Sequence, residues 1–368
     1  MIRKATFFLA FNLALIMVLW LLLEGTASTV LVVQQLAKAK PIAERAHTTY
    51  DAELGWVNLP DIVIPDMYGP GCSLRINGQR FRHDGPVEPA VPAGKIRIIC
   101  SGDSFTFGYG VDNDHTWCQQ LATLDPRLET VNMGQGGYGV DQAYLWYKRD
   151  GVRYDHAIQL FAFVTTDFER MLFDSFLGYG KPMLDVHDGT LVVRNVPVPR
   201  PPWYRLWLVR YAPILQKLSA VQAVRALLPS HSAPDGRSRE EIGNWARQVL
   251  AAIIEDLEQI NQAKHSVLVL VLLPTRDDYT GSKADFWRDF LHTESARRHI
   301  AYIDVIAALR RLPPQEIEPL FIREGQVGYV AAAGHYSEKG NAYIATQLYE
   351  SLRTLPETAA KYSISQLR

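Results

Sequence analysis

Ser104 is the residue whose setting most clearly suggests chemistry. An apolar run predicts a strand over residues 95–101, and Gly102, Asp103 and Ser104 follow it, with a helix predicted a few residues later. The carboxyl ends of parallel strands form the crevice in which α/β sheets bind ligands. A serine there becomes a nucleophile when a base reaches its hydroxyl and backbone N–H groups face the developing oxyanion. The alternative is a turn that uses glycine and serine for conformational freedom alone.

Three further segments follow other predicted strands. Residues 132–142 are rich in glycine, which lets the backbone approach a ligand, but they contain neither a phosphate-loop lysine nor a dinucleotide fingerprint. Residues 165–167 are Thr-Thr-Asp, and His335 lies just before the last predicted helix. A lone histidine is more often incidental, but a neutral imidazole with an ordinary pKa of about 6.5 suits a general base. Its place after the last strand favours the second interpretation.

Alternating strands and helices are expected to position these segments. We expect strands at residues 95–101, 129–133, 157–165, 266–273 and 299–305, and helices at 117–124, 141–149, 240–263 and 341–352. This alternation predicts a parallel sheet with helices on both faces. The run of Val and Leu at 266–273 is typical of a strand buried on both faces.

Two segments depart from this alternation. Residues 50–94 are rich in Pro and Gly and predict an irregular arm packed on the domain. Residues 171–238 form an insertion, in which we expect a hairpin of residues 183–186 and 191–193. Apolar residues recur at helical spacing over 206–228. This pattern predicts a cap helix packed on the sheet, and the alternatives are a lid or a surface lying on a bilayer.

The amino terminus predicts a membrane anchor. Residues 5–23 carry no charge, which is about the length that spans a bilayer, and Arg3 and Lys4 before them favour a cytoplasmic amino end. The alternative is a cleaved signal peptide with small residues at 26–28. We therefore expect a single-pass inner-membrane protein with its main domain in the periplasm. The predicted parts are residues 1–33 (tip and anchor), 34–94 (linker and arm), 95–355 (main domain) and 356–368 (tail).

Composition excludes several classes of function. The chain has 368 residues and a formal net charge of −1, with acids and bases interspersed, so we expect no nucleic-acid partner. Three cysteines are too few for a metal cluster or a disulfide framework. Cys100 lies in a predicted strand and is expected to be buried, and a Cys72–Cys118 bridge remains an open alternative. We expect no cofactor and no metal.

Together the four segments resemble the blocks of the SGNH (GDSL-type) hydrolases, and in particular a membrane-anchored bacterial subset. The resemblance assigns Ser104 as nucleophile, Gly137 as oxyanion glycine and His335 as base, and residues 55–56 and 76–82 are similar to the arm of anchored members. It implies an α/β, three-layer flavodoxin-like fold with a parallel sheet of about five strands. It also implies a serine esterase or O-acyltransferase acting on a small acyl ester, in which acetyl on an envelope glycan is one candidate substrate.

Two positions depart from the family pattern. Thr166 stands where the family has an asparagine that donates to the oxyanion, and a hydroxyl reaches less far than an amide. Alanines stand at 332 and 333, where an acid normally orients the histidine. A backbone carbonyl could take over this role, as could one of three acids. These acids are Asp304, Asp167 and Glu338.

These departures motivate a second hypothesis about function. The protein would then be a catalytically weakened member of the fold that serves as a binding or assembly component of an envelope polysaccharide system. In both hypotheses the partners are an acyl ester or carbohydrate and, through the amino-terminal helix, a lipid bilayer.

Overall fold

A five-stranded parallel sheet forms the centre of the main domain. The computed structural model describes residues 2–38, 46–176, 178–202, 204, 211 and 239–364. The strands are β5 (Ile96–Gly102), β6 (Leu128–Gly134), β7 (Ile158–Phe163), β12 (Val267–Leu272) and β13 (Ala301–Asp304). They lie in the order β13-β12-β7-β5-β6. If the five strands are numbered 1 to 5 along the chain and read from the β6 edge, the order is 2-1-3-4-5. This is the flavodoxin-like order, and the predicted fold class is confirmed.

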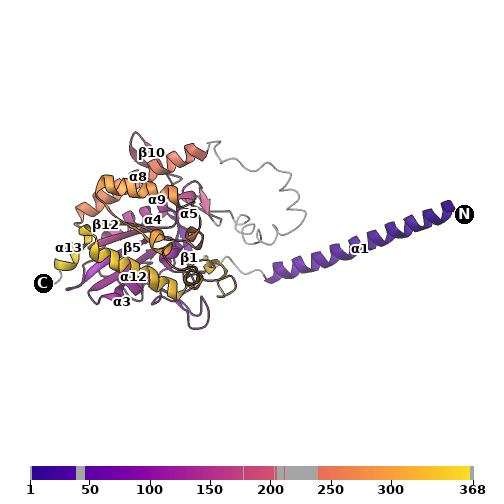
Figure 1. The fold of residues 1–368 in the computed structure, drawn as a ribbon, viewed down its shortest axis with the longest axis horizontal. Helices are drawn as coiled ribbons and strands as arrows, with labels where there is room; N and C mark the ends of the chain where they lie inside the picture. Colours follow the sequence, from indigo (N-terminus) through magenta and orange to yellow (C-terminus); the bar gives the residue numbers. More distant parts are fainter. Residues whose placement is uncertain are drawn as a thin grey trace. The chain divides into compact units, whose positions relative to one another are not determined.

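Helices cover both faces of this sheet (Figure 1). One face packs against α4 (Val140–Arg149), α8 (Arg239–Ala263) and α9 (Asp285–Arg298). The other packs against α3 (Trp117–Leu124) and α12 (Glu338–Thr354). Side chains alternate between the two cores along each strand, as the two-residue period requires. The strands are mostly apolar because both faces are buried, and the polar exceptions include Arg97, Asn132 and Gln159.

The predicted elements differ from the observed ones mainly at their ends. A helix, α5 (Thr165–Arg170), begins where the third strand was expected to continue, and α10 (Val305–Leu309) begins where the last one was. The sequence analysis assigned no helix at α9, whose many charged residues obscure its apolar side. Parallel neighbours need a crossover, and α9 supplies it between β12 and β13. The expected tail contains α13 (Pro356–Ile364).

The arm is more regular than expected. It contains two antiparallel pairs, β1 (Thr48–Asp51) with β2 (Gly55–Asn58), and β3 (Ile62–Ile64) with β4 (Leu74–Ile76). In the insertion, β8 (Ser175–Phe176) pairs with β9 (Tyr179–Gly180). The expected hairpin is confirmed as β10 (Met183–His187) with β11 (Thr190–Arg194). The expected cap helix at 206–228 lies outside the described residues.

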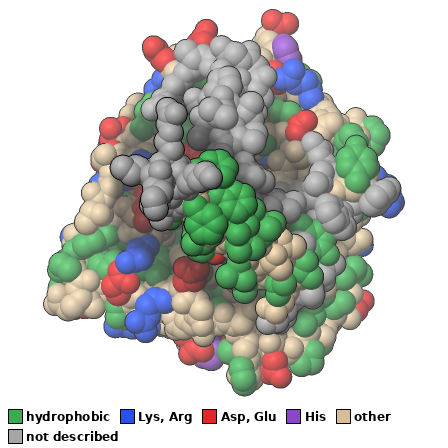
Figure 2. All heavy atoms as spheres, turned by 90° about the vertical axis from the view of Figure 1, so that its right-hand side faces the viewer, with side chains coloured by type: hydrophobic (Ala, Val, Ile, Leu, Met, Phe, Trp, Pro, Cys, Tyr) green, Lys and Arg blue, Asp and Glu red, His purple; other side chains and the backbone are tan. Residues whose placement is uncertain are grey.

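All three cysteines are free, so the Cys72–Cys118 bridge is not formed, and Cys100 is fully buried as expected. On the described part of the face in Figure 2, basic and acidic side chains are interspersed and form no stripe of one sign. This distribution agrees with the near-zero net charge.

The amino-terminal segment is a single helix, α1 (Ile2–Lys38). Within it Phe11–Gln34 is long and apolar enough to cross a membrane, and a signal sequence has the same character. This span is longer than the uncharged run of residues 5–23 and extends past its end to include Glu24. One acidic residue in 24 does not outweigh the apolar side chains on both sides of it.

Candidate active site

Ser104 lies at the carboxyl end of β5, one residue after Asp103. A single helical turn, α2 (Ser104–Phe107), begins at the serine itself, not a few residues later as predicted. The Asp103 carboxylate caps this turn by accepting the Phe105 N–H at 2.8 Å. A Cβ at Gly102 would overlap the Thr106 hydroxyl and the Ala162 carbonyl, so only glycine fits there. The strand-to-helix turn therefore presents Ser104 in one defined position.

His335 reaches Ser104 across 231 positions of sequence. Its Nε2 lies 2.7 Å from the Ser104 Oγ, which is hydrogen-bond distance for a nucleophile and its base. The imidazole stacks on Phe105 with a centroid separation of 4.4 Å, and Tyr109 packs at 5.2 Å. These rings hold the imidazole over α2.

Aromatic burial also sets the protonation of His335. Burial, and then the positive charge of Arg170, lower its pKa to about 4, against the opposing effect of the backbone carbonyls of residues 331–333. At neutral pH the ring is therefore uncharged and can accept a proton. Its Nδ1 makes no well-formed hydrogen bond within the described residues.

The acids considered as partners of His335 are engaged elsewhere. Asp304 caps α10 by accepting the Ala307 N–H at 3.1 Å, and it pairs with Arg288. Asp167 accepts the Val164 N–H at 3.0 Å. Glu338 is exposed and lies 3.9 Å from His115. The structure therefore does not bring Asp304 or Asp167 to the imidazole, because helix caps and ion pairs use their oxygens.

The glycine-rich loop lies against the Ser104 turn. Gly134 pairs with Gly102, and the Asn132 side chain donates to the Thr106 carbonyl at 2.9 Å. Gly137 follows with a φ of +79°, and a Cβ there would lie 2.7 Å from the Phe176 ring. The structure thus brings the loop that carries Gly137 beside α2.

Thr166 has a different position. It is exposed in the first turn of α5 and lines a cleft of about 780 Å³ together with Thr165, Thr275 and Trp287. Ser104 and His335 do not line this cleft. The predicted role of Thr166 as a third oxyanion donor is therefore not supported by its placement, because β7 ends at Phe163 and Thr166 lies in the first turn of α5.

The arm fixes both loops of the site. The Trp56 Nε1 donates to the Gly136 carbonyl at 2.9 Å, and the Tyr138 hydroxyl donates to the Trp56 carbonyl at 2.5 Å. Arg82, fully buried, donates to the carbonyls of Phe107 at 2.8 Å and Gly108 at 2.5 Å. The arm segments singled out in the sequence thus hold the glycine loop and the turn after Ser104.

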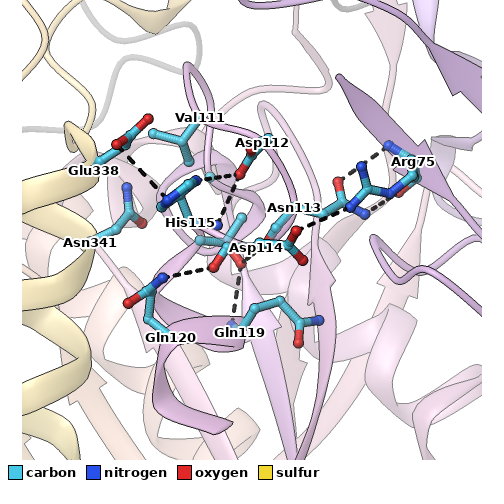
Figure 3. A network of polar contacts seen from close by, with 12 residues as sticks. Arg75, Val111, Asp112, Asn113, Asp114, His115, Gln119, Gln120, Glu338 and Asn341 are labelled. Atoms are coloured by element: carbon cyan, nitrogen blue, oxygen red, sulfur yellow. Dashed lines mark hydrogen bonds and ion pairs between the residues drawn. The ribbon is translucent and has the colours of Figure 1, made fainter. Parts of the chain in front are cut away.

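A polar network extends this support toward the helix that follows His335 (Figure 3). The Asn113 side chain accepts from Arg82 Nε at 2.9 Å and donates to the Arg75 carbonyl at 2.9 Å. His115 lies 2.6 Å from Asp112 and 3.9 Å from Glu338 on α12. Burial opposes protonation of His115, but the hydrogen bond with Asp112 and the nearby acids raise its pKa overall. The loop after Ser104 is thereby tied to α12.

Two charged residues at the site were missed by the sequence analysis. Arg170 contacts Asp167 and lies 3.6 Å from Asp103, and Lys181 is fully buried against Asp141 at 2.6 Å. Neither lies in one of the four segments, and a single basic residue has no distinctive sequence signal. Only their contacts in the folded structure draw attention to them: Arg170 lies beside Asp103, and Lys181 donates to the Arg170 carbonyl.

Comparison with known proteins gives matches to solved structures alone. No protein-family model matches the sequence, and no curated protein matches it. The structure is similar to a member of the lipolytic protein G-D-S-L family from Veillonella parvula DSM 2008, at 16% identity and a TM-score of 0.39 over 71% of this chain and all of that one. It is similar to the lipase/acylhydrolase from Enterococcus faecalis, at 12% identity and a TM-score of 0.38 over 70% of this chain and 95% of that one.

An acetyl xylan esterase, AlAXEase, is similar at 11% identity and a TM-score of 0.40 over 70% of this chain and all of that one. These values describe likeness of fold. With its four sequence segments and its 2-1-3-4-5 sheet order, the chain resembles the SGNH (GDSL-type) hydrolases.

Proposed function

We propose that the protein is a serine esterase or O-acyltransferase of the SGNH type that works with a Ser104–His335 dyad. The observation that carries this proposal is the 2.7 Å separation between His335 Nε2 and Ser104 Oγ. His335 takes the hydroxyl proton as Ser104 attacks the acyl carbonyl, and it then protonates the leaving oxygen. Water or a second hydroxyl then accepts the acyl group, which gives hydrolysis or transfer.

The backbone N–H groups of Ser104 and Gly137 hold the oxyanion in this mechanism. Support comes from the close packing of the glycine loop on α2 at Gly134, where an added Cβ would lie 2.1 Å from the Phe107 nitrogen. The dyad replaces the usual acid with backbone carbonyls of residues 331–333, which act on the imidazole in the direction that an acid would. A carbonyl stabilises the imidazolium less than a carboxylate does, so we expect modest turnover.

The substrate proposal is a small acyl group on a polyhydroxylated alcohol such as a sugar. The cleft beside α5, which Ser104 and His335 do not line, would hold the sugar beyond the ester. Threonine hydroxyls line it after β7 and β12, together with charged side chains such as Asp277 and Lys283. Trp287 lines it too, with one ring face stacked on Phe168 at 4.0 Å. An indole with surrounding hydroxyls suits a sugar better than a long acyl chain. Removal of Trp287 should raise KM for an acetylated oligosaccharide and leave p-nitrophenyl acetate turnover unchanged.

The cellular setting belongs to the same proposal. Helix α1 anchors the protein in the inner membrane with its amino end in the cytoplasm, and the catalytic domain is periplasmic. The length and apolar character of Phe11–Gln34 support the anchor, and Arg3 and Lys4 support its orientation.

Covalent labelling tests the reaction class directly. The full chain in detergent should react with a fluorophosphonate probe and hydrolyse p-nitrophenyl acetate. Both activities should disappear in Ser104→Ala and fall at least a hundredfold in His335→Ala. Ser282→Ala and His292→Ala, at exposed positions, are matched controls that should behave as wild type.

The second candidate is a non-catalytic binding component. Two observations favour it: His335 Nδ1 has no acidic partner and makes no well-formed hydrogen bond within the described residues, and Thr166 is exposed. A folded protein that neither labels nor turns over ester, yet binds oligosaccharide, would support this candidate against the esterase.

A further inference from the structure

Arg170 joins three segments that the candidate mechanism requires to be in register. Its guanidinium Nη1 donates to the Tyr138 carbonyl at 2.9 Å, in the loop that carries Gly137. The same nitrogen pairs with Asp167 at 2.5 Å and lies 3.6 Å from Asp103, the residue before Ser104. One side chain therefore contacts the glycine loop and α5 and lies beside the nucleophile turn.

Contacts with the insertion fix the position of Arg170. The Lys181 ammonium donates to the Arg170 carbonyl at 2.7 Å and to Asp141 at 2.6 Å. The guanidinium also lies over the Phe176 ring at 5.2 Å, and this ring packs against Gly137. Burying an ion pair such as Lys181–Asp141 carries a large desolvation penalty, so the pair need not add to the free energy of unfolding. It does hold Arg170 in one place.

Charge balance beside Ser104 gives the second argument. Asp103 and Asp167 are both buried and hydrogen-bonded to one another, and burial raises the pKa of both carboxyl groups, that of Asp167 well above its usual range. The pair therefore tends to hold one proton and one negative charge. Asp103 Oδ2 lies 3.5 Å from the Ser104 Oγ, so an unbalanced anion there would oppose negative charge developing on the substrate. Arg170 supplies the balancing cation.

We propose that Arg170 is the positioning residue of this site, which locks the Ser104 turn to the Gly137 loop and neutralises the buried Asp103–Asp167 pair beside the nucleophile. This inference rests on the proposed function for its kinetic consequence alone. Its electrostatic consequence, the lowering of the His335 pKa by the guanidinium charge, does not depend on whether the protein turns over ester.

The test uses the full chain in detergent with Arg170→Met and Arg170→Lys. The His335 ring is titrated by NMR in protein with ¹³C-labelled histidine, and its signal is assigned by its loss in His335→Gln. Arg170→Met should move the His335 titration upward from about pH 4, because the cation that opposes protonation is gone. Arg170→Lys keeps the charge and should leave the titration near that of wild type.

Kinetics separate position from charge. In Arg170→Lys the contacts to the Tyr138 carbonyl and both acids cannot all be kept, so kcat for p-nitrophenyl acetate should fall about ten- to a hundredfold with KM within about twofold. Arg297→Gln, an exposed arginine on α9, is the matched control and should change neither readout.

Each outcome decides something. An unshifted His335 titration in folded Arg170→Met overturns the electrostatic role, and wild-type kcat in Arg170→Lys overturns the positioning role. If wild type shows no turnover, the proposed function fails, and the NMR comparison still tests the link from Arg170 to His335. If Arg170→Met does not fold, the His335 titration is measured in Arg170→Gln instead. If neither neutral variant folds and Arg170→Lys has wild-type kinetics, the proposal is overturned.

Discussion

The pH dependence of activity is the sharpest test of the His335 environment. The acid limb of kcat/KM reports the pKa of the essential base in the free enzyme. Burial by Phe105 and Tyr109, together with the charge of Arg170, lowers the pKa of His335 to about 4. We therefore expect activity to persist well below the pH at which an ordinary histidine dyad fails.

The size of the effect follows from the titration alone. At pH 5 a base with a pKa of about 4 is roughly 90% neutral, whereas one with the ordinary value of about 6.5 is roughly 3% neutral. The two cases differ about thirtyfold in kcat/KM at pH 5, relative to the plateau. The assay is p-nitrophenyl acetate hydrolysis between pH 4 and 8, with product measured after alkaline quenching.

Acid unfolding must be separated from titration of the base. Burial lowers the pKa of His47 to about 3 and that of His156 to about 4, so both resemble His335. Below pH 6.5 these histidines are protonated in the unfolded chain but stay neutral in the folded protein. The free energy of unfolding therefore decreases as the pH falls from 6.5 toward 4. Circular dichroism and recovery of activity at pH 7 identify the pH range in which the fold is intact. Within that range, an acid limb centred near pH 6.5 would refute the buried-imidazole reasoning.

Three further predictions concern the turn, the arm and the anchor. Gly102→Ala should lower the free energy of unfolding by about 3 kcal/mol or more in denaturant titrations, because the new Cβ meets backbone; Gly243→Ala on α8, where the nearest atom is 3.6 Å away, should be neutral or stabilising. Trp56→Phe removes the donor to the Gly136 carbonyl and should lower kcat about tenfold with little change in KM. An unchanged kcat would show that this arm contact does not support catalysis. An alkaline phosphatase fusion after residue 45 should be active, and an inactive fusion contradicts the predicted orientation.

Much of the main domain was predictable from local pattern. The strands at 95–101 and 266–273 are rich in apolar residues on both faces, which indicates a sheet covered on two sides. The observed β5 and β12 match them within a residue or two. The serine turn was also predictable from the sequence, because the glycine at position 102 is required between β5 and α2. These features depend on residues near one another in the chain, where periodicity and steric limits act directly.

Tertiary structure decided what supports Ser104. The meeting of Ser104 with His335, 231 positions apart, depends on the whole sheet order. The candidate acids looked alike in sequence, but Asp304 and Asp167 are held by helix caps and arginines, which leaves the imidazole with backbone carbonyls. Arg170 had no local signal at all. The sequence alone therefore determined a nucleophile-like turn in a doubly wound sheet, and long-range packing, which no local pattern encodes, decided which charges surround it.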